Sequence, residues 1–205
     1  MSNRDIFYNF LKEEFNESAH GILEKFDALF SLLLEINLQI NLFSRQTNTD
    51  DLWTLHFLDS LLILKTGAKL NKKIICDIGT GGGLPGIPLA IIYPESRVFM
   101  LDSKRKKLSA IDMICAKLGL FNCQTVHARL EDACFDYEEY FDVLTSRALK
   151  ILPDFVKPMR KMMKKSAKIY LYKSVILDDC ALFEDKKLFD VSREDLGKRT
   201  IVEIN

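Results

Sequence analysis

The feature of this sequence that most constrains the fold is a glycine-rich turn directly after a short apolar run. Residues 74–78 read Ile-Ile-Cys-Asp-Ile, and the turn that follows contains Gly79, Gly81, Gly82 and Gly83. A short apolar run that ends at glycines is typical of a strand buried on both faces. Glycine lets the backbone turn tightly and approach a ligand without an intervening side chain. We therefore expect a ligand-binding α/β domain.

The chain after this turn alternates between apolar runs and amphipathic segments. Predicted strands are 98–102, 123–127, 141–146 and 168–174, and predicted helices are 85–93, 104–119 and 153–165. Strands that alternate with helices of this length favour a parallel, doubly wound sheet. Such sheets bind ligands at the carboxyl ends of their strands, so we expect chemistry just after residues 78, 102, 127 and 146. We assign no role to residues 176–205.

The part of the chain before the turn has apolar residues at helical spacing and contains no proline. Asp50 is placed to cap a third helix in this part. We expect a helical extension, residues 1–70, that packs on an α/β core of residues 71–205 to form one compact unit.

Charge and composition exclude several classes of protein. The 29 basic and 29 acidic residues cancel, which argues against a protein that coats nucleic acid indiscriminately but leaves local patches open. The five cysteines and three histidines show no metal-ligand spacing, so we expect reduced structural thiols and no metal. No apolar run approaches the roughly 18 residues of a membrane span, and the charged N-terminus lacks a signal-peptide pattern. We expect a cytoplasmic protein without a membrane segment.

Three interpretations of the glycine turn compete. A P-loop requires a Gly-Lys-Ser/Thr sequence, and this turn contains no lysine, which excludes that interpretation. Gly81, Gly83 and Gly86 match the dinucleotide fingerprint G-x-G-x-x-G, which would indicate an NAD-type oxidoreductase. Asp77, Gly79, Gly81 and Gly83 match D-x-G-x-G-x-G, the nucleoside-binding loop of a methyltransferase that uses S-adenosylmethionine (AdoMet).

Charge favours the methyltransferase interpretation. AdoMet carries an ammonium and a sulfonium cation, so the Asp77 carboxylate would attract it, whereas the same carboxylate would repel a pyrophosphate. Asp102 ends the next predicted strand, where an acid suits hydrogen bonding to ribose hydroxyls. The structural alternatives are a turn-capping role for Asp77 and a helix-capping role for Asp102. We expect AdoMet as the cofactor, bound by Asp77, Gly79, Gly81 and Asp102.

A second polar group lies before the glycine turn. His56, Asp59 and Ser60 share one face of a predicted helix. In the structural interpretation, His56 is buried and its helix neighbour Asp59 satisfies it. In the functional interpretation, the group closes the cofactor pocket, and both interpretations stay open.

Basic residues concentrate in two stretches. One begins the predicted helix at residue 104, and the other lies within residues 155–177, which contain no acidic residue. Such a run is usually a solvated face, but it would also steer an RNA backbone toward the protein. The candidate RNA contacts are Lys104, Arg105, Arg160, Lys161, Lys164, Lys165 and Lys173.

The segment from Asp77 to Pro88, DIGTGGGLPGIP, resembles the signature of the bacterial RsmG family, also called GidB. The Pro-Gly-Ile-Pro that follows the glycines is more specific than the glycines alone. Further similar pieces occur in order between residues 35 and 175, for example His-Phe-Leu-Asp-Ser-Leu from residue 56. The resemblance implies a Rossmann-like class I AdoMet-dependent methyltransferase fold. It also implies methylation of guanine N7 in 16S ribosomal RNA, at nucleotide 527.

The resemblance implies roles for single residues as well. Gly79 and Leu84 would contact the methionine part of AdoMet, and Leu130 and Glu131 would lie beside its adenine. Arg147 matches an arginine that the family assigns to the cofactor. Guanine N7 has a free lone pair, so we expect alignment and no general acid or base. Residues expected near the pocket are Ser146, Arg147, His56 and Asp59.

The partner that the resemblance implies is 16S ribosomal RNA, in the small subunit or in an assembly intermediate, and we expect a monomer. Two alternatives remain open. One is the NAD-type oxidoreductase, and the other is a non-catalytic RNA-binding or ribosome-assembly factor on the same fold.

Overall fold

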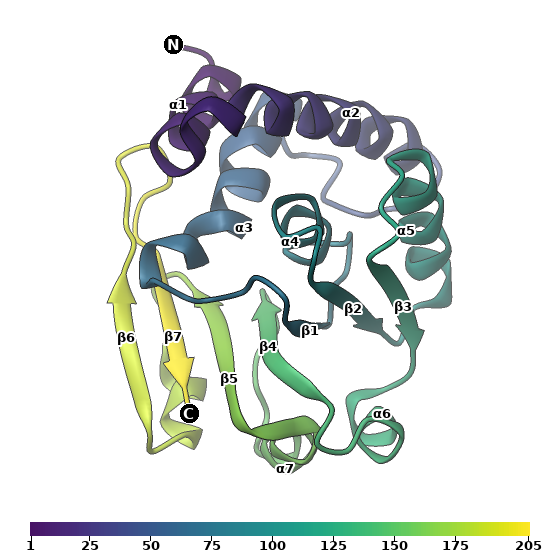
Figure 1. The fold of residues 1–205 in the computed structure, drawn as a ribbon, viewed down its shortest axis with the longest axis vertical. Coiled ribbons are helices and arrows are strands. Elements are labelled where there is room, and N and C mark those ends of the chain that lie inside the picture. Colours follow the sequence, from purple (N-terminus) through teal and green to yellow (C-terminus); the bar gives the residue numbers. More distant parts are fainter.

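A seven-stranded sheet with the order β3-β2-β1-β4-β5-β7-β6 runs through the computed structural model, which describes residues 1–205 (Figure 1). Its strands are β1 (Ile74–Ile78), β2 (Arg97–Asp102), β3 (Cys123–His127), β4 (Phe141–Arg147), β5 (Met163–Lys173), β6 (Lys186–Asp190) and β7 (Thr200–Ile204). The first five strands are parallel, whereas β7 lies antiparallel between β5 and β6. The parallel strands predicted from the apolar runs are confirmed.

Helices cover both faces of the sheet (Figure 1). One face carries α4 (Gly86–Ile92) and α5 (Arg105–Lys117), and the other carries α6 (Leu130–Asp136) and α7 (Pro153–Met162). Helices on the two faces follow from right-handed crossovers between parallel strands, and they confirm the doubly wound architecture. Four short 3₁₀ turns complete the chain: η1 (Asn16–Ser18), η2 (Thr49–Asp51), η4 (Leu62–Thr66) and η5 (Asp178–Leu182).

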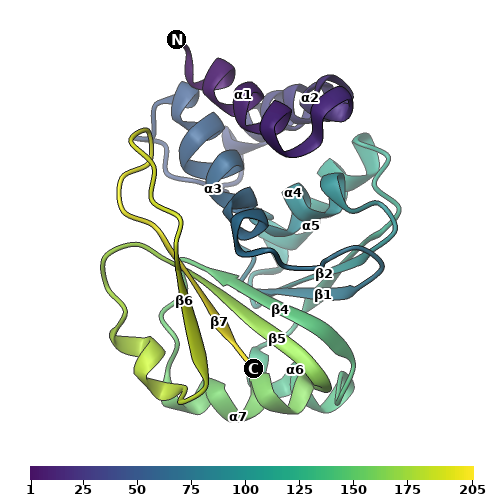
Figure 2. The ribbon, with the colours of Figure 1, turned by 60° about the vertical axis from the view of Figure 1, so that its left-hand side comes forward.

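The N-terminal helices form a third layer over α4 and α5 (Figure 2). This layer contains α1 (Asn3–Phe15), α2 (Ala19–Asn37), the π-helical segment η3 (Leu52–Leu58) and α3 (Asp59–Leu61). One cluster of 38 buried apolar residues joins this layer to the sheet, because it includes Phe7 and Phe26 as well as Ile75 and Ile111. Burial of a side chain of this size contributes about 2 kcal/mol, so the helices and the sheet stabilise each other.

The prediction that Asp50 caps a helix is wrong. The Asn48 side chain is the cap, and it accepts a hydrogen bond from the Asp50 N–H at 3.2 Å. Asp50 itself lies inside the short turn η2, which leads into η3 rather than into a regular helix. Asparagine and aspartate cap equally well, so their order in the sequence did not discriminate between them.

The end of the predicted helix 153–165 is also wrong. Helix α7 ends at Met162, and Met163 already pairs with Phe141 of the neighbouring strand. Strand pairing outcompetes the helical periodicity there, because buried backbone groups at the sheet edge need partners. The acidic connection after β3 contains the helix α6, which the sequence did not indicate.

Residues 176–205 supply η5, β6 and β7, and thereby extend the sheet beyond β5. All five cysteines are free thiols. None of the helices combines the length and the apolar character that crossing a bilayer requires.

Candidate functional site

The glycine turn is fixed to the end of the neighbouring strand. The N–H groups of Gly79 and Thr80 donate to the Leu101 carbonyl at 2.9 and 3.0 Å. Gly79 and Gly81 have φ angles of +69° and +59°, in the left-handed region that side chains disfavour. The turn therefore exposes backbone, not side chains, at the carboxyl ends of β1 and β2.

Other glycines of the signature allow close packing. A Cβ atom at Gly82 would lie 2.7 Å from the Leu42 carbonyl oxygen, and one at Gly86 would lie 2.6 Å from Met100 Cγ. A Cβ at Gly83 would lie 2.5 Å from the Ile87 side chain. Gly83 and Gly86 thus face the interior, and the formal G-x-G-x-x-G match has no pyrophosphate-binding geometry.

Asp77 lies beneath the turn and is fully buried. Its Oδ2 accepts a hydrogen bond from the Gly86 N–H at 3.0 Å, and its Oδ1 accepts one from Thr145 Oγ1 at 3.2 Å. Burial raises the pKa of Asp77 to about 6, although these hydrogen bonds oppose the shift. The expected direct contact between Asp77 and the cofactor is corrected to a role inside the turn, since the side chain points away from the cleft and holds the start of α4.

A cleft of about 500 Å³ opens above the turn, at the carboxyl ends of β1, β2 and β3. Five of the predicted cofactor residues line it: Gly79, Gly81, Asp102, Leu130 and Glu131. These residues lie up to 52 positions apart in the chain (131 minus 79), and parallel strand order brings them together.

Both oxygens of the Asp102 carboxylate already accept backbone hydrogen bonds. Oδ2 accepts from the Gly81 N–H at 2.9 Å, and Oδ1 accepts from the Lys104 N–H at 2.8 Å. Each carboxylate oxygen has a second lone pair, so Asp102 can still accept from a ligand hydroxyl. The capping role and the ligand-binding role that the sequence left open are therefore compatible.

A second cleft of about 270 Å³ adjoins the first and shares Gly79, Gly81 and Leu149 with it. The predicted residues Leu84, His56 and Arg147 line this second cleft. Its remaining lining includes Leu42, Phe43 and Thr80.

The segment that carries Leu42 and Phe43 is held by Asn37, a residue that the sequence analysis missed. Asn37 is buried, and its Oδ1 accepts hydrogen bonds from the N–H groups of Leu42 at 2.7 Å and Phe43 at 3.1 Å. A lone asparagine at the end of a helical pattern gives no signal of this contact beyond its tendency to end helices.

Arg147 connects the second cleft to the N-terminal layer. Its NH1 donates to Asp59 Oδ2 at 3.1 Å, and its NH2 lies 3.3 Å from His56 Nδ1. Asp59 therefore pairs with Arg147 and does not satisfy His56, so the geometry favours the polar cluster over the simple helix pair. Burial, and next the charge of Arg147, lower the pKa of His56 to about 4, although Asp59 opposes this shift.

Ser146 does not reach either cleft. It is 2 % exposed, and its hydroxyl donates to the Ile78 carbonyl at 3.0 Å. The expectation that Ser146 lies in the pocket is therefore wrong, because alternation along β4 turns this residue to the other face of the sheet from Arg147.

Most of the predicted RNA contacts lie far from the clefts. Strand β5 starts at Met163 and runs parallel to β4, so the end of α7 lies at the amino edge of the sheet, opposite the clefts. Lys161 and Lys164 also pair with the carboxylates of Glu138 and Asp142, at 3.4 and 3.0 Å. The predicted RNA contacts that lie at this amino edge, away from the clefts, are Arg160, Lys161, Lys164 and Lys165.

Lys173 lies at the carboxyl edge, but its side chain is only 9 % exposed and pairs with Asp179. The prediction that Lys173 contacts RNA is wrong for this reason. Lys104 lines the first cleft together with Lys107, and Arg105 is exposed beside them. The basic residues that remain available near the clefts are therefore those at the start of α5.

A family model described as rRNA small subunit methyltransferase G (GidB) matches residues 22–196. The chain belongs to the GidB family. The relative from Mesoplasma florum, named ribosomal RNA small subunit methyltransferase G, is 37 % identical over 161 residues, which cover 78 % of this chain and 67 % of that protein. The GidB relative of the same name from Christiangramia forsetii is 34 % identical over 189 residues, which cover 89 % of this chain and 87 % of its own.

Solved structures show the same fold as this GidB chain. A SAM-dependent methyltransferase from Aquifex aeolicus superposes with a TM-score of 0.58 at 13 % identity, covering 86 % of this chain and 98 % of that one. A precorrin-6y C5,15-methyltransferase from Geobacter metallireducens gives 0.57 at 15 % identity, covering 72 % and 87 %. Together with the strand order, these likenesses confirm the Rossmann-like class I methyltransferase fold with an N-terminal helical extension.

Proposed function

We propose that this chain is an AdoMet-dependent methyltransferase that methylates N7 of a guanine in 16S ribosomal RNA, at nucleotide 527. The single observation that carries the proposal is the pair of adjoining clefts at the carboxyl edge of a GidB-family sheet. The first cleft has the volume and the lining groups for a nucleoside, and the second, of about 270 Å³, has room for a base beside it. The relatives named above are ribosomal RNA small subunit methyltransferases, which supports RNA as the substrate.

The residues of the first cleft fit AdoMet. Gly79 and Gly81 have no side chain that would block a ligand, and Asp102 can accept from ribose hydroxyls. Leu130 supplies an apolar wall for the adenine, with Glu131 at its edge.

Thr80 adds a further polar group at the junction of the clefts. Its Oγ1 is buried and has no partner within strict hydrogen-bond geometry, although it lies close enough to the Asp77 carboxylate to lower the pKa of that group. Thr80 also lines the second cleft. A ligand that offers a polar atom there, such as the amino-acid end of AdoMet, would give this hydroxyl a partner besides Asp77.

AdoMet, when bound, supplies a methyl group activated by a sulfonium. Guanine N7 attacks with its own lone pair, so the protein needs no general base, and its contribution is to hold the reacting atoms in line at about 3 to 3.5 Å. Arg147 can donate to guanine O6, the acceptor next to N7, and so hold the base by an edge that adenine lacks.

The charges around the second cleft bear on how the methylated product leaves, because Asp59 is shared by Arg147 and Arg199 and the cluster is net positive. Methylation of N7 places a positive charge on the guanine ring. His56 is neutral at pH 7 because its pKa is about 4, so it adds no repulsion. The Asp59 carboxylate behind Arg147 offsets part of the cationic field on the same side.

The RNA would approach the clefts past the start of α5. Lys104, Arg105 and Lys107 present positive charge along that edge, and such charge attracts an RNA backbone regardless of sequence. We infer that the substrate is a small subunit or an assembly intermediate, that the protein acts as a monomer, and that it is cytoplasmic, where these particles occur.

The test is transfer of labelled methyl from AdoMet to 30S subunits that lack the modification. Large subunits, tRNA and deproteinised 16S RNA serve as parallel substrates, and cleavage at 7-methylguanosine maps the product. Label at nucleotide 527 of 16S RNA is the expected result. Label only in another substrate contradicts the assigned target. If the chain neither transfers methyl nor binds AdoMet, the result contradicts the methyltransferase activity and favours an RNA-binding factor.

A further inference from the structure

The C-terminal hairpin places an arginine against the polar cluster of the second cleft. Arg199, the residue before β7, donates from Nε to Asp59 Oδ1 at 2.8 Å. Asp59 Oδ2 at the same time accepts from Arg147 NH1 at 3.1 Å. Asp59 and Arg199 are 140 positions apart in the chain, and the Asp59 carboxylate is shared between Arg199 and Arg147.

The shared carboxylate is held on both of its oxygens. The exposed fractions are 10 % for Asp59, 14 % for Arg147 and 23 % for Arg199, so water competes weakly for these contacts. Two guanidinium groups on the two oxygens fix both the position and the plane of the carboxylate, because each contact is directional. With only one guanidinium bound, the carboxylate could rotate about its Cβ–Cγ bond.

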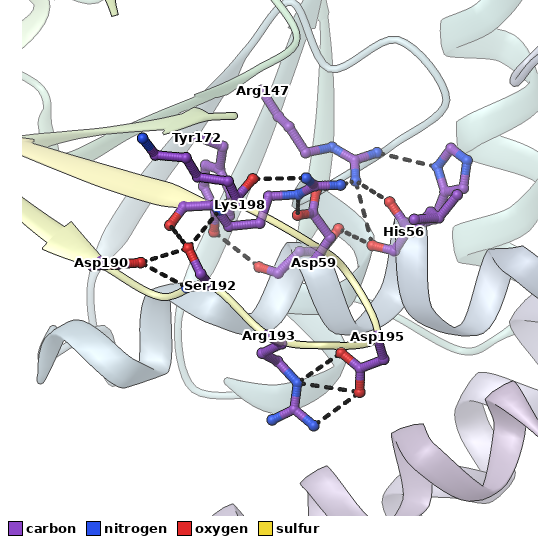
Figure 3. A network of polar contacts seen from close by, with 12 residues as sticks. His56, Asp59, Arg147, Tyr172, Asp190, Ser192, Arg193, Asp195 and Lys198 are labelled. Atoms are coloured by element: carbon purple, nitrogen blue, oxygen red, sulfur yellow. Dashed lines mark hydrogen bonds and ion pairs between the residues drawn. The ribbon is translucent and has the colours of Figure 1, made fainter. Parts of the chain in front are cut away.

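Arg199 is itself fixed by the hairpin around it. Its backbone N–H donates to Ser192 Oγ at 3.0 Å, and its carbonyl accepts from the Val191 N–H at 3.0 Å. Its NH1 donates to the carbonyl of Lys198 at 2.9 Å. Figure 3 shows Asp190 and Ser192 of the hairpin on one side of Asp59 and His56 on the other side.

Arg199 reaches the reaction site only indirectly. It lines a small pocket of about 170 Å³ with Asp59 and Arg147, and it lines neither of the two clefts assigned to the cofactor and the base. Any influence on a ligand in the second cleft therefore passes through Asp59 to Arg147.

We propose that Arg199 is a positioning residue, which fixes Asp59 from the C-terminal hairpin and thereby sets the orientation of Arg147 in the second cleft. The inference rests on the proposed function, because it concerns how the guanine is held. It also gives a role to residues 176–205, to which the sequence analysis assigned none.

The test compares Arg199→Met with Arg193→Met in the full chain. Arg193 is the matched control, since it lies in the same hairpin and pairs with Asp195 at 3.0 Å but does not touch the cluster. Arg199→Met should lower kcat/KM for 30S methylation about tenfold, the scale of coupling between residues in one ionic network, whereas Arg193→Met should leave it unchanged. Arg199→Lys should restore part of the rate, because lysine keeps the charge but lacks the planar fork.

A double-mutant cycle separates positioning from simple support of the fold. If Arg199 acts through Asp59, then Arg199→Met should cost nothing further in an Asp59→Asn background. A full additional loss in that background overturns the proposal, as does wild-type kcat/KM for Arg199→Met alone. Thermal unfolding of each variant shows whether a loss of rate merely follows a loss of fold.

A histidine titration tests the same inference without methylation. The chain has only three histidines, so NMR can follow the His56 ring separately. In Arg199→Met, the pKa of His56 should rise, because Arg147, which lowers it, is less well held and Asp59, which raises it, has lost a cation. If the wild-type chain transfers no methyl, the proposed function fails, and this titration still judges the positioning. An unchanged His56 pKa in Arg199→Met overturns the positioning role of Arg199.

Discussion

Asp102 Oδ2 accepts a hydrogen bond from the Gly81 N–H at 2.9 Å, and this contact ties the glycine turn after β1 to the end of β2. The predicted ribose-binding acid is therefore also a structural member of the turn. Ligand affinity and local order depend on the same carboxylate.

Replacement of Asp102 should impair AdoMet binding more than it impairs stability. Asp102→Ala removes both the ribose partner and the tie to Gly81, and we expect the Kd for AdoMet to rise at least about tenfold, as for the loss of one good charge-assisted hydrogen bond. Isothermal titration calorimetry measures this. Asp112→Ala is the matched control, because Asp112 is an exposed acid on α5 whose partner is Thr125. Equal affinity in Asp102→Ala and Asp112→Ala would contradict the assignment.

Two glycine-to-alanine changes should have opposite effects on stability. In Gly82→Ala the new Cβ would lie 2.7 Å from the Leu42 carbonyl oxygen. Because this oxygen belongs to the backbone, the segment around Leu42 would have to shift, and we expect a loss of about 1–3 kcal/mol in the free energy of unfolding. In Gly21→Ala, inside α2, the new Cβ meets no atom within 4 Å, so helix propensity should add about 0.5–1 kcal/mol. Urea unfolding of both variants checks the pair, and a stable Gly82→Ala would show that the segment around Leu42 does not pack as described.

Asn37 should matter for the second cleft although it lies outside it. Asn37→Ala leaves the N–H groups of Leu42 and Phe43 without their partner, which costs about 1–3 kcal/mol when such groups stay buried. The wall formed by Phe43 should loosen, and methyl transfer should fall with it. Asn71→Ala is the control, because that asparagine makes only an exposed contact with Glu95. Methyl transfer rates equal in the two variants would refute the link.

Asp77 should make the protein less stable as the pH rises. Its folded-state pKa of about 6 lies above the ordinary 3.8, so its contribution is fully present below pH 4 and is lost as the pH rises through 6. Asp77→Asn keeps a carbonyl oxygen for the Gly86 N–H and removes the buried charge. Well above pH 6 the variant should be more stable than wild type by about 3 kcal/mol. Urea unfolding at pH 5 and pH 8 gives the answer, and an identical pH profile of the two proteins would exclude this account.

The contribution of His56 to stability should change with pH in the opposite direction to that of Asp77, over nearly the same pH range. Its folded-state pKa of about 4 lies below the ordinary 6.5, so its contribution is present above pH 6.5 and is lost as the pH falls toward 4. His56→Gln cannot be protonated, and it should lose less stability than wild type on acidification from pH 7 to pH 4.5. Thermal melts across this range measure the difference. His20→Gln, at an exposed position, should behave like wild type.

Local signals in the sequence were sufficient for the five parallel strands and for the position of the first cleft, but they did not indicate β6 and β7. The apolar runs fixed β1 to β4 closely, and the residues that end them fall at one edge because parallel strands share their direction. Asp102 could be named for this reason, since it ends a strand at the edge where such folds bind ligands, whereas Leu130 and Glu131 were named through the family resemblance.

The direction in which a side chain points was decided only by the tertiary structure. Asp77 was expected to face the cofactor, but its hydrogen bonds to the start of α4 turn it inward. The basic residues at the end of α7 form a cluster in the sequence, yet the direction of β5 places them at the edge away from the clefts.

What the sequence by itself determined is therefore the five parallel strands, the glycine turn and the acid that ends β2, all of which depend on short-range periodicity and on strand ends. Only the tertiary structure brought Arg199 to Asp59 and Asn37 to Leu42 and Phe43. The physical reason is that such polar contacts depend on how separate layers pack. Packing is set by the shared apolar core of the helices and the sheet, which spacing along the chain does not encode.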